Sequence, residues 1–185
     1  MILRQARADD IPAIDAMHFF SVQGLGVACY SPAELEAFMC HGTYDTALVH
    51  AGTYFVIEAR GQIVASGGWA RSLPHSEVAG AGLEEGAALL SPTSAKIRSV
   101  FVHPNHARRG LGSRLVRHAE GAAAAAGFRL LELWASLPGV PLYRRLGYQE
   151  VARMAIPGGT GVSVPAVHMA KIMGAESIGA ETHAA

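Results

Sequence analysis

The segment that most constrains the fold lies just past the middle of the chain. Residues 96–102 are β-rich, and the strand they predict must end before Pro104, whose ring nitrogen cannot donate to a β-ladder. Apolar residues then recur at helical spacing over residues 110–126, and Gly127 supplies a C-terminal stop. The segment therefore predicts a strand, a proline-broken turn and a helix in direct succession.

Strand and helix patterns continue on both sides of this segment. Before it we expect a strand, two helices with a Gly-containing connection, and a hairpin: residues 2–8, a helix capped by Asp9, residues 22–30, a helix from Ser31 or Pro32, and residues 54–71. After it we expect a strand, a short helix and two strands: residues 128–136, 141–146, 148–156 and 162–171. This order predicts one α+β domain over residues 1–172 rather than an alternating doubly wound sheet. Residues 173–185 have little to bury, so we expect a disordered tail.

Residues 72–93 show no periodicity and combine prolines, glycines and three glutamates. A loop of this length inside a compact domain is usually functional, or else mobile. We therefore expect this loop to contribute to the functional site or to move.

Charge is balanced over the whole chain but not along it. The 15 Lys and Arg residues match the 15 Asp and Glu residues, so the net charge is zero with neutral His. A polyanion binder would carry a basic excess, so we predict no nucleic-acid partner. Residues 96–117 contain six Lys and Arg residues and no Asp or Glu, so the rest of the chain carries a net charge of −6. Any anion site must therefore be local.

The N-terminus and the apolar segments indicate a soluble cytoplasmic protein without a membrane partner. Arg4, Arg7 and Asp9 interrupt any N-terminal apolar run that could serve as a signal peptide. No later segment approaches the ~18 apolar residues that a membrane span needs.

Cysteines and histidines do not form a recognisable metal site, so we predict no metal. Cys29 and Cys40 have no partners at metal-site spacing, and we expect both to be buried small apolar residues. A nucleophilic Cys40 beside a histidine is the alternative, although adjacent side chains point apart. His103 and His106 are spaced like a metal pair, but their proline-broken turn holds no further ligands.

The predicted helix start at Gly110 has the properties of an anion site. The first amides of a helix lack intrahelical partners and carry a partial positive charge. Gly110 and Gly112 remove side chains that would hold a phosphate away from these amides. No carboxylate competes in the first turn, and Arg108, Arg109 and Arg114 add positive charge. We interpret the turn as a pyrophosphate site; the alternative is a tight turn with solvated arginines.

The stretch Ala107-Arg-Arg-Gly-Leu-Gly112 resembles the acetyl-CoA signature of the GNAT N-acetyltransferase superfamily, Gln/Arg-x-x-Gly-x-Gly/Ala. Ala107 replaces the first residue of the signature, which removes one side-chain contribution. The resemblance implies a single-domain GNAT-like fold, with a mixed, mostly antiparallel sheet of about six to seven strands flanked by about four helices. It also implies acetyl-CoA as co-substrate, its pyrophosphate held by the backbone amides of the turn: Arg108, Arg109, Gly110, Leu111, Gly112 and Ser113.

Two further segments carry the same resemblance. The strand before the turn is similar to the family's bulged central strand, which implies that the backbone of Phe101 and Val102 binds pantetheine and holds the thioester carbonyl. Residues 136–148 resemble the family's strand-to-helix segment, which implies that Tyr143 protonates the departing CoA thiolate. A thiol with a pKa of ~8.5 and a phenol with a pKa of ~10 are close enough for this transfer. The alternative is that Tyr143 only packs against CoA. Pro138 stands where many relatives carry an asparagine, so that contact is lost.

These features predict an acetyl-CoA-dependent N-acetyltransferase that moves an acetyl group to a primary amine of a small molecule or peptide by direct attack on the thioester. The alternatives are a non-catalytic acyl-CoA-binding regulatory module and a phosphate- or nucleic-acid-binding protein, for which an aromatic platform is missing. By the same resemblance, we expect the acceptor site to come from residues 16–39, 72–93 and 153–164. Homodimerisation through edge strands is left open.

The general base is not assigned by the sequence. An alkylammonium with a pKa of ~10.4 must lose a proton before it attacks, at a cost of about 4.6 kcal/mol at pH 7. The candidates for accepting that proton are His75, Glu77, Glu84 and Glu85 in the long loop, or a water relay at Ser99.

Overall fold

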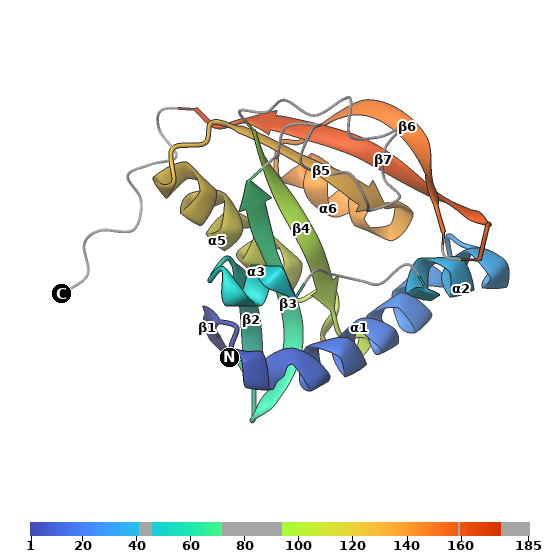
Figure 1. Cartoon of the computed structure of the whole chain (residues 1–185), viewed down its shortest axis with the longest axis horizontal. Helices are drawn as coiled ribbons and strands as arrows, with labels where there is room; N and C mark the ends of the chain where they lie inside the picture. The colour runs from blue at the N-terminus through green and yellow to red at the C-terminus, as the bar shows by residue number, and fades with distance from the viewer. Residues whose placement is uncertain (41–45, 72–93, 159, 175–185) are drawn as a thin grey trace.

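A central sheet organises the protein (Figure 1), whose computed structural model describes residues 1–40, 46–71, 94–158 and 160–174. In this part of the chain seven strands form one sheet: β1 (Ile2–Gln5), β2 (Tyr54–Ala59), β3 (Gln62–Arg71), β4 (Ser94–Val102), β5 (Leu130–Ser136), β6 (Gln149–Pro157) and β7 (Ser163–Ile172). The helices are α1 (Ile11–Gly26), α2 (Pro32–Cys40), α3 (Ala47–His50), α5 (Leu111–Ala125) and α6 (Val140–Arg145), with short 3-10 turns η1 (Ala8–Asp10), η3 (Pro104–His106) and η4 (Leu137–Gly139). The strand order is β1-β2-β3-β4-β5-β7-β6; β4 and β5 run parallel, and the other neighbours run antiparallel. This confirms the predicted mixed, mostly antiparallel sheet.

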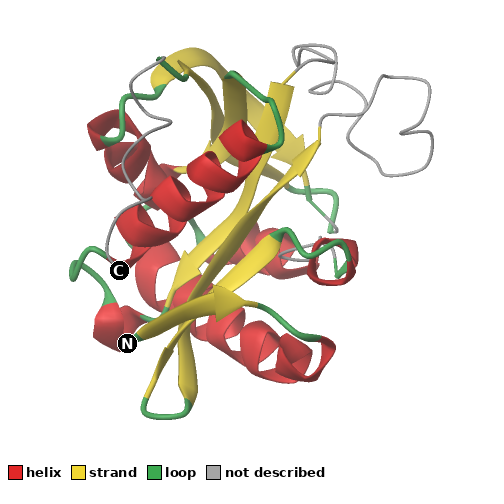
Figure 2. Cartoon of the chain, turned by 90° about the vertical axis from the view of Figure 1, so that its left-hand side faces the viewer, coloured by secondary structure: helices red, strands yellow, loops and turns green. Residues whose placement is uncertain are grey.

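Helices cover both faces of the sheet (Figure 2). α5 packs on β2, β3 and β4, and Leu115, Val116 and Ala119 on its inner side are fully buried. α1 packs on β3 and β4, and its Ile14 belongs to a different buried cluster together with Val56. Because successive side chains of a strand point to opposite faces, β2 contributes to both clusters. None of the described helices is long and apolar enough to cross a membrane.

The hairpin predicted for residues 54–71 is confirmed. β2 and β3 pair antiparallel, and the turn residues Arg60 and Gly61 have φ angles of 52° and 75°. Two consecutive residues at positive φ produce the tight turn whose twist matches that of paired strands. The strand, proline-broken turn and helix predicted for residues 96–126 are also found, as β4, η3 and α5.

Helix α1 is longer than predicted: it continues to Gly26, whereas the sequence places its end near residue 22. A Cβ atom on Gly24 would lie 2.4 Å from Pro104 Cγ, and one on Gly26 would lie 2.6 Å from Leu35 Cδ2. The two glycines therefore allow α1 to pack closely on its neighbours. Their role is in tertiary packing, which a local reading mistakes for a helix break.

Several residues at the ends of elements lie elsewhere than predicted. Cys29 and Cys40 were expected to be buried, but both are exposed, because one follows the end of α1 and the other is the last residue of α2. Asp9 lies in η1 and not at the cap of α1. Met173, assigned to the tail, packs in the main core, and its amide donates to the Arg129 carbonyl at 2.8 Å. Residues 175–185, the rest of the predicted tail, lie outside the described residues.

Candidate functional site

Strands β4 and β5 part near the centre of the sheet. They pair over three residues of each strand, and a cavity of about 660 Å³ is lined by residues of both, including Val102 and Leu133. Ser99, in the middle of β4, has a φ of 52°, and the β3–β4 register shifts between Ser66 and Gly68. Such a bulge bends its strand, which accounts for the early end of the β4–β5 pairing.

The backbone of β4 turns one amide toward the cavity. The His103 N–H donates to the Val64 carbonyl at 2.9 Å, so at this position the chain faces β3. Because peptide groups alternate along a strand, the Val102 amide points to the other side, where Val102 lines the cavity. The Phe101 amide then points toward β3, where Phe101 pairs with Ser66. Val102 is therefore the better placed of the two backbone donors that the sequence named.

The turn after β4 leads into the N-terminus of α5. Arg108 and Gly110 have φ angles of 62° and 80°, which reverse the chain ahead of the helix. The first backbone bond of the helix runs from the Arg114 N–H to the Gly110 carbonyl at 3.0 Å, so the three amides before Arg114 have no intrahelical acceptor. The first turn of α5 contains no acidic residue. Free amides at the positive end of a helix are the arrangement that an anion site requires, and here they lie beside the cavity.

The two glycines of the turn have different structural roles. Gly110 has open space around it, and its left-handed backbone is the reason for glycine there. A Cβ atom on Gly112 would lie 3.1 Å from Leu142 Cδ2 and 3.7 Å from Val102 Cγ2, so this glycine lets α5 approach α6 and β4. Besides the room for a phosphate that the sequence predicts, Gly110 thus serves the backbone conformation and Gly112 serves close packing.

The fold brings eight of the nine predicted site residues to this one cavity. The residues that line it are Phe101, Val102, Arg108, Gly110, Leu111, Gly112, Ser113 and Tyr143. Arg109, the ninth, is exposed and does not line it. Among the described lining residues, every charged side chain is cationic: Lys96, Arg98, Arg108 and Arg145. The local positive charge predicted for residues 96–117 therefore faces the cavity in part.

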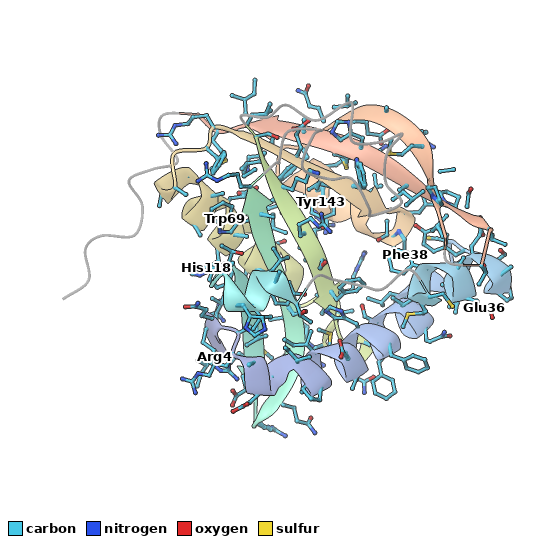
Figure 3. All side chains as sticks on the ribbon, in the orientation of Figure 1. Arg4, Glu36, Phe38, Trp69, His118 and Tyr143 are labelled. Carbon is cyan, nitrogen blue, oxygen red and sulfur yellow. The ribbon has the colours of Figure 1, made fainter. Side chains whose placement is uncertain are left out.

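Tyr143 on α6 and Phe38 on α2 reach the cavity from different parts of the chain (Figure 3). Tyr143 is only 7% exposed, and burial raises the pKa of its phenol well above the usual value. A phenol holds its proton at neutral pH with or without this shift, and the raised pKa makes Tyr143 a weaker acid toward a thiolate than a solvated tyrosine would be. The acid role of Tyr143 stays a prediction.

A buried polar network that the sequence did not predict lies behind the bulge of β4. His18 Nε2 lies 2.7 Å from Ser66 Oγ, and the Tyr54 hydroxyl lies 3.1 Å from the same oxygen. Tyr54 also donates to the Ser99 carbonyl at 2.9 Å, and the His18 ring centroid lies 4.1 Å from that of Phe101. The network thus holds the bulge and a neighbouring cavity residue. No local sequence pattern predicts this network, because its residues come from four elements that meet only in the folded chain.

We expect the protein to lose stability as the pH falls below about 6.5, in part through His18. Burial lowers the pKa of His18 to about 3, whereas an unfolded histidine titrates near 6.5. The unfolded state therefore takes up a proton between these pH values that the folded state does not, which costs about 2 kcal/mol at pH 5. Urea unfolding at pH 7 and pH 5 measures the loss. In His18→Gln the difference between the free energies of unfolding at pH 7 and at pH 5 should shrink by that amount. An unchanged difference would contradict the prediction.

The part of the cavity formed by α1, α2, β6 and β7 is mostly apolar. It is lined by Ser21, Val22, Phe38, Ile156 and Val164, among others. These residues come from two of the three ranges in which an acceptor site was expected, residues 16–39 and 153–164. The third range, residues 72–93, lies outside the described residues.

The general base stays unassigned. Ser99 lines the cavity, as a water relay at this position requires. The other candidates, His75, Glu77, Glu84 and Glu85, lie outside the described residues. Over the part of the chain that is described, no group of three or more His, Cys, Asp or Glu side chains could hold a metal ion.

Comparison with protein families matches residues 50–150 to the acetyltransferase (GNAT) domain. The match covers more than half of the 185 residues and contains the hairpin, the bulged strand, the turn before α5 and Tyr143. A search of curated protein sequences gives no match. The family match therefore includes every element of the cavity wall that the sequence assigned to the cofactor.

Solved structures share this fold at low sequence identity. One is a GCN5-related N-acetyltransferase from Rhodopseudomonas palustris, with a TM-score of 0.70 and 20% identity over 93% of this chain and 95% of that one. Another is the PaiA N-acetyltransferase from Thermoplasma acidophilum in complex with coenzyme A. Its TM-score is 0.64 and its sequence identity is 11%, over 92% of this chain and 98% of that one. A third is a GNAT family acetyltransferase from Brucella melitensis in complex with acetyl-CoA. Its TM-score is 0.57 and its sequence identity is 19%, over 94% of this chain and 88% of that one. At these identities the likeness establishes the fold.

Proposed function

The chain belongs to the GNAT acetyltransferase family, and from this we propose that it is an acetyl-CoA-dependent N-acetyltransferase acting on a primary amine of a small molecule or peptide. The observation that carries the proposal is the single cavity at which the parted strands β4 and β5, the N-terminus of α5 and Tyr143 meet. One ligand could there use an anion site, the backbone of a strand and a buried phenol. Acetyl-CoA has a matching group for each: a pyrophosphate, a pantetheine chain and a thioester sulfur.

The residues present fit acetyl-CoA. The amides at the start of α5 bind the pyrophosphate in this proposal, and Arg108 and Arg145 add charge from the cavity wall. The cavity volume of about 660 Å³ is within the ~300–1,000 Å³ typical of ligand sites. Acetyl-CoA supplies the activated acyl group. The protein contributes binding, orientation and proton transfer.

Two groups of the protein act at the acyl carbon in the proposed reaction. The amine nitrogen attacks the thioester carbonyl directly; the new C–N bond forms and the C–S bond breaks. The Val102 amide stabilises the charge that develops on the carbonyl oxygen, an effect typically worth ~2.7 to 4 kcal/mol per donor. Tyr143 donates its proton to the departing sulfur. The proton of the amine passes to solvent, and a water relay at Ser99 is one of the candidate routes.

Calorimetry with acetyl-CoA tests the proposal first. Acetyl-CoA should bind with one-to-one stoichiometry, and S-acetylpantetheine, which lacks the pyrophosphate, should bind much more weakly. Absence of acetyl-CoA binding would overturn the proposal. CoA release over a panel of amino acids, polyamines, aminoglycosides and peptides should then identify the acceptor. If acetyl-CoA binds but none of the amines causes release of CoA, a regulatory module that senses acyl-CoA is favoured instead.

A further inference from the structure

The hydroxyl of Tyr30 links three parts of the chain that are far apart in sequence. Tyr30 lies in the connection between α1 and α2, and only 8% of its surface is exposed. Its hydroxyl donates to the Pro165 carbonyl at 2.9 Å and accepts the Leu137 N–H at 2.8 Å. One oxygen therefore joins the helical connection to β7 and to the first residue of η4.

The register of the sheet shows what this hydroxyl replaces. β5 and β7 pair antiparallel down to Ser136 and Ala166. The next positions along the two strands are Leu137 and Pro165, and a single hydroxyl reaches the N–H of one and the carbonyl of the other. Tyr30 is therefore inserted at the end of the β5–β7 ladder, where the two backbone groups would otherwise face each other directly.

The position of this insertion connects it to the proposed chemistry. Leu137 begins η4, which leads directly into α6 and so to Tyr143. Tyr30, Leu137 and Tyr143 all line the same cavity. A backbone that closed onto Pro165 would move the start of η4, and the displacement would be passed to α6. We propose that Tyr30 is a positioning residue, whose hydroxyl holds β5 and β7 apart and so sets the location of Tyr143.

The hydroxyl, and not the ring, is the part that Tyr30 needs for this role. The ring packs among apolar side chains, with Leu35 and Val164 in one cluster and Phe38 at a centroid distance of 6.4 Å. Phenylalanine would keep these contacts and lose both hydrogen bonds. The oxygen must also stay protonated, because it donates to one carbonyl while accepting from an amide. Burial, which raises the pKa of the Tyr30 phenol, favours that state.

Tyr30→Phe tests the proposal, which rests on the proposed function only for its kinetic part. Hydrogen exchange at the Leu137 amide should become roughly tenfold faster, because the amide loses its acceptor. kcat should fall on the order of tenfold, less than the ~100-fold that a 1 Å misplacement can cost. The dissociation constant of acetyl-CoA should change by less than about twofold, because the amides that bind pyrophosphate are not displaced.

Tyr148→Phe is the matched control, since it also removes a buried phenol hydroxyl and Tyr148 does not line the cavity. It should leave both Leu137 exchange and kcat near the values of the unsubstituted protein. Unchanged Leu137 exchange in Tyr30→Phe would overturn the hydrogen-bond bridge, whatever the protein catalyses. Faster exchange with unchanged kcat would overturn the positioning role. If the unsubstituted protein fails to bind acetyl-CoA, the proposed function fails, but the exchange measurement still tests the bridge.

A second substitution keeps the proposal testable if Tyr30→Phe does not fold. A fluorinated tyrosine at position 30 retains the shape and both hydrogen bonds while its phenol ionises at lower pH. The proposal then requires kcat to fall as the pH rises through that lowered pKa, because the ionised oxygen can no longer donate to the Pro165 carbonyl. A pH profile identical to that of the unsubstituted protein would contradict it.

Discussion

Tyr143→Phe should lower kcat on the order of 100-fold while changing the dissociation constant of acetyl-CoA by less than about twofold. The phenol is buried at the cavity wall and is protonated at neutral pH. Phenylalanine preserves the ring and its packing, so the substitution removes the proton donor alone. Steady-state kinetics with the best acceptor, together with calorimetry for acetyl-CoA, measures the two effects separately.

Tyr148→Phe is the control for this substitution as well. The two rings lie 5.7 Å apart between centroids and are both buried, but Tyr148 does not line the cavity. It should retain kcat within about twofold, because no proton transfer is assigned to it. Equal losses of kcat and of acetyl-CoA binding in Tyr143→Phe would show that Tyr143 packs against the ligand without acting as an acid.

Ser113→Asp should weaken acetyl-CoA binding on the order of 100-fold or more. Ser113 lies in the first turn of α5 and lines the cavity, so the new carboxylate would stand beside the amides assigned to the pyrophosphate. Placing like charges side by side costs several kcal/mol, and each 1.4 kcal/mol corresponds to about tenfold in affinity. Folding should not suffer, because a carboxylate in the first turn stabilises a helix by roughly 0.3–1 kcal/mol.

Ser113→Asn is the matched control, because it has nearly the shape of the aspartate variant but no charge. Its affinity for acetyl-CoA should stay close to that of the unsubstituted protein. Calorimetry gives the affinities, and thermal unfolding without ligand confirms that both variants are folded. If the two substitutions weaken binding equally, steric exclusion is the cause and the pyrophosphate assignment is wrong.

The turn between β4 and α5 was predictable because everything that produces it is local in the sequence. A proline ends β4, glycine permits the left-handed backbone before α5, and apolar spacing marks the helix. The absence of acids in the first turn is likewise visible without a structure. The same reasoning found the hairpin, because two β-rich runs meet at a short turn that contains Gly61, and Gly61 has a φ of 75°.

The roles of individual residues within these elements were less predictable. Gly24 and Gly26 suggest a helix break when the sequence is considered locally. In the structure they lie inside α1, and their missing side chains leave room for Pro104 and Leu35. Gly112 suggests phosphate access, yet its missing side chain accommodates Leu142. These contacts join positions that are 9, 30 and 80 residues apart in the sequence. Only packing reveals which neighbour a missing side chain makes room for.

By itself, the sequence determined the order of the elements and the glycine-containing turn ahead of α5, because these depend on short-range spacing and backbone preferences. The mixed sheet was what the family resemblance implied. The tertiary structure alone decided how β4 parts from β5, which backbone amide turns into the gap, and how Tyr54 and Tyr30 hold the two sides of the cavity. The bulge of β4 and the start of η4 are held by hydrogen bonds between residues 45 and 107 positions apart. The partners of such bonds are chosen by the path of the folded chain, which no local pattern contains.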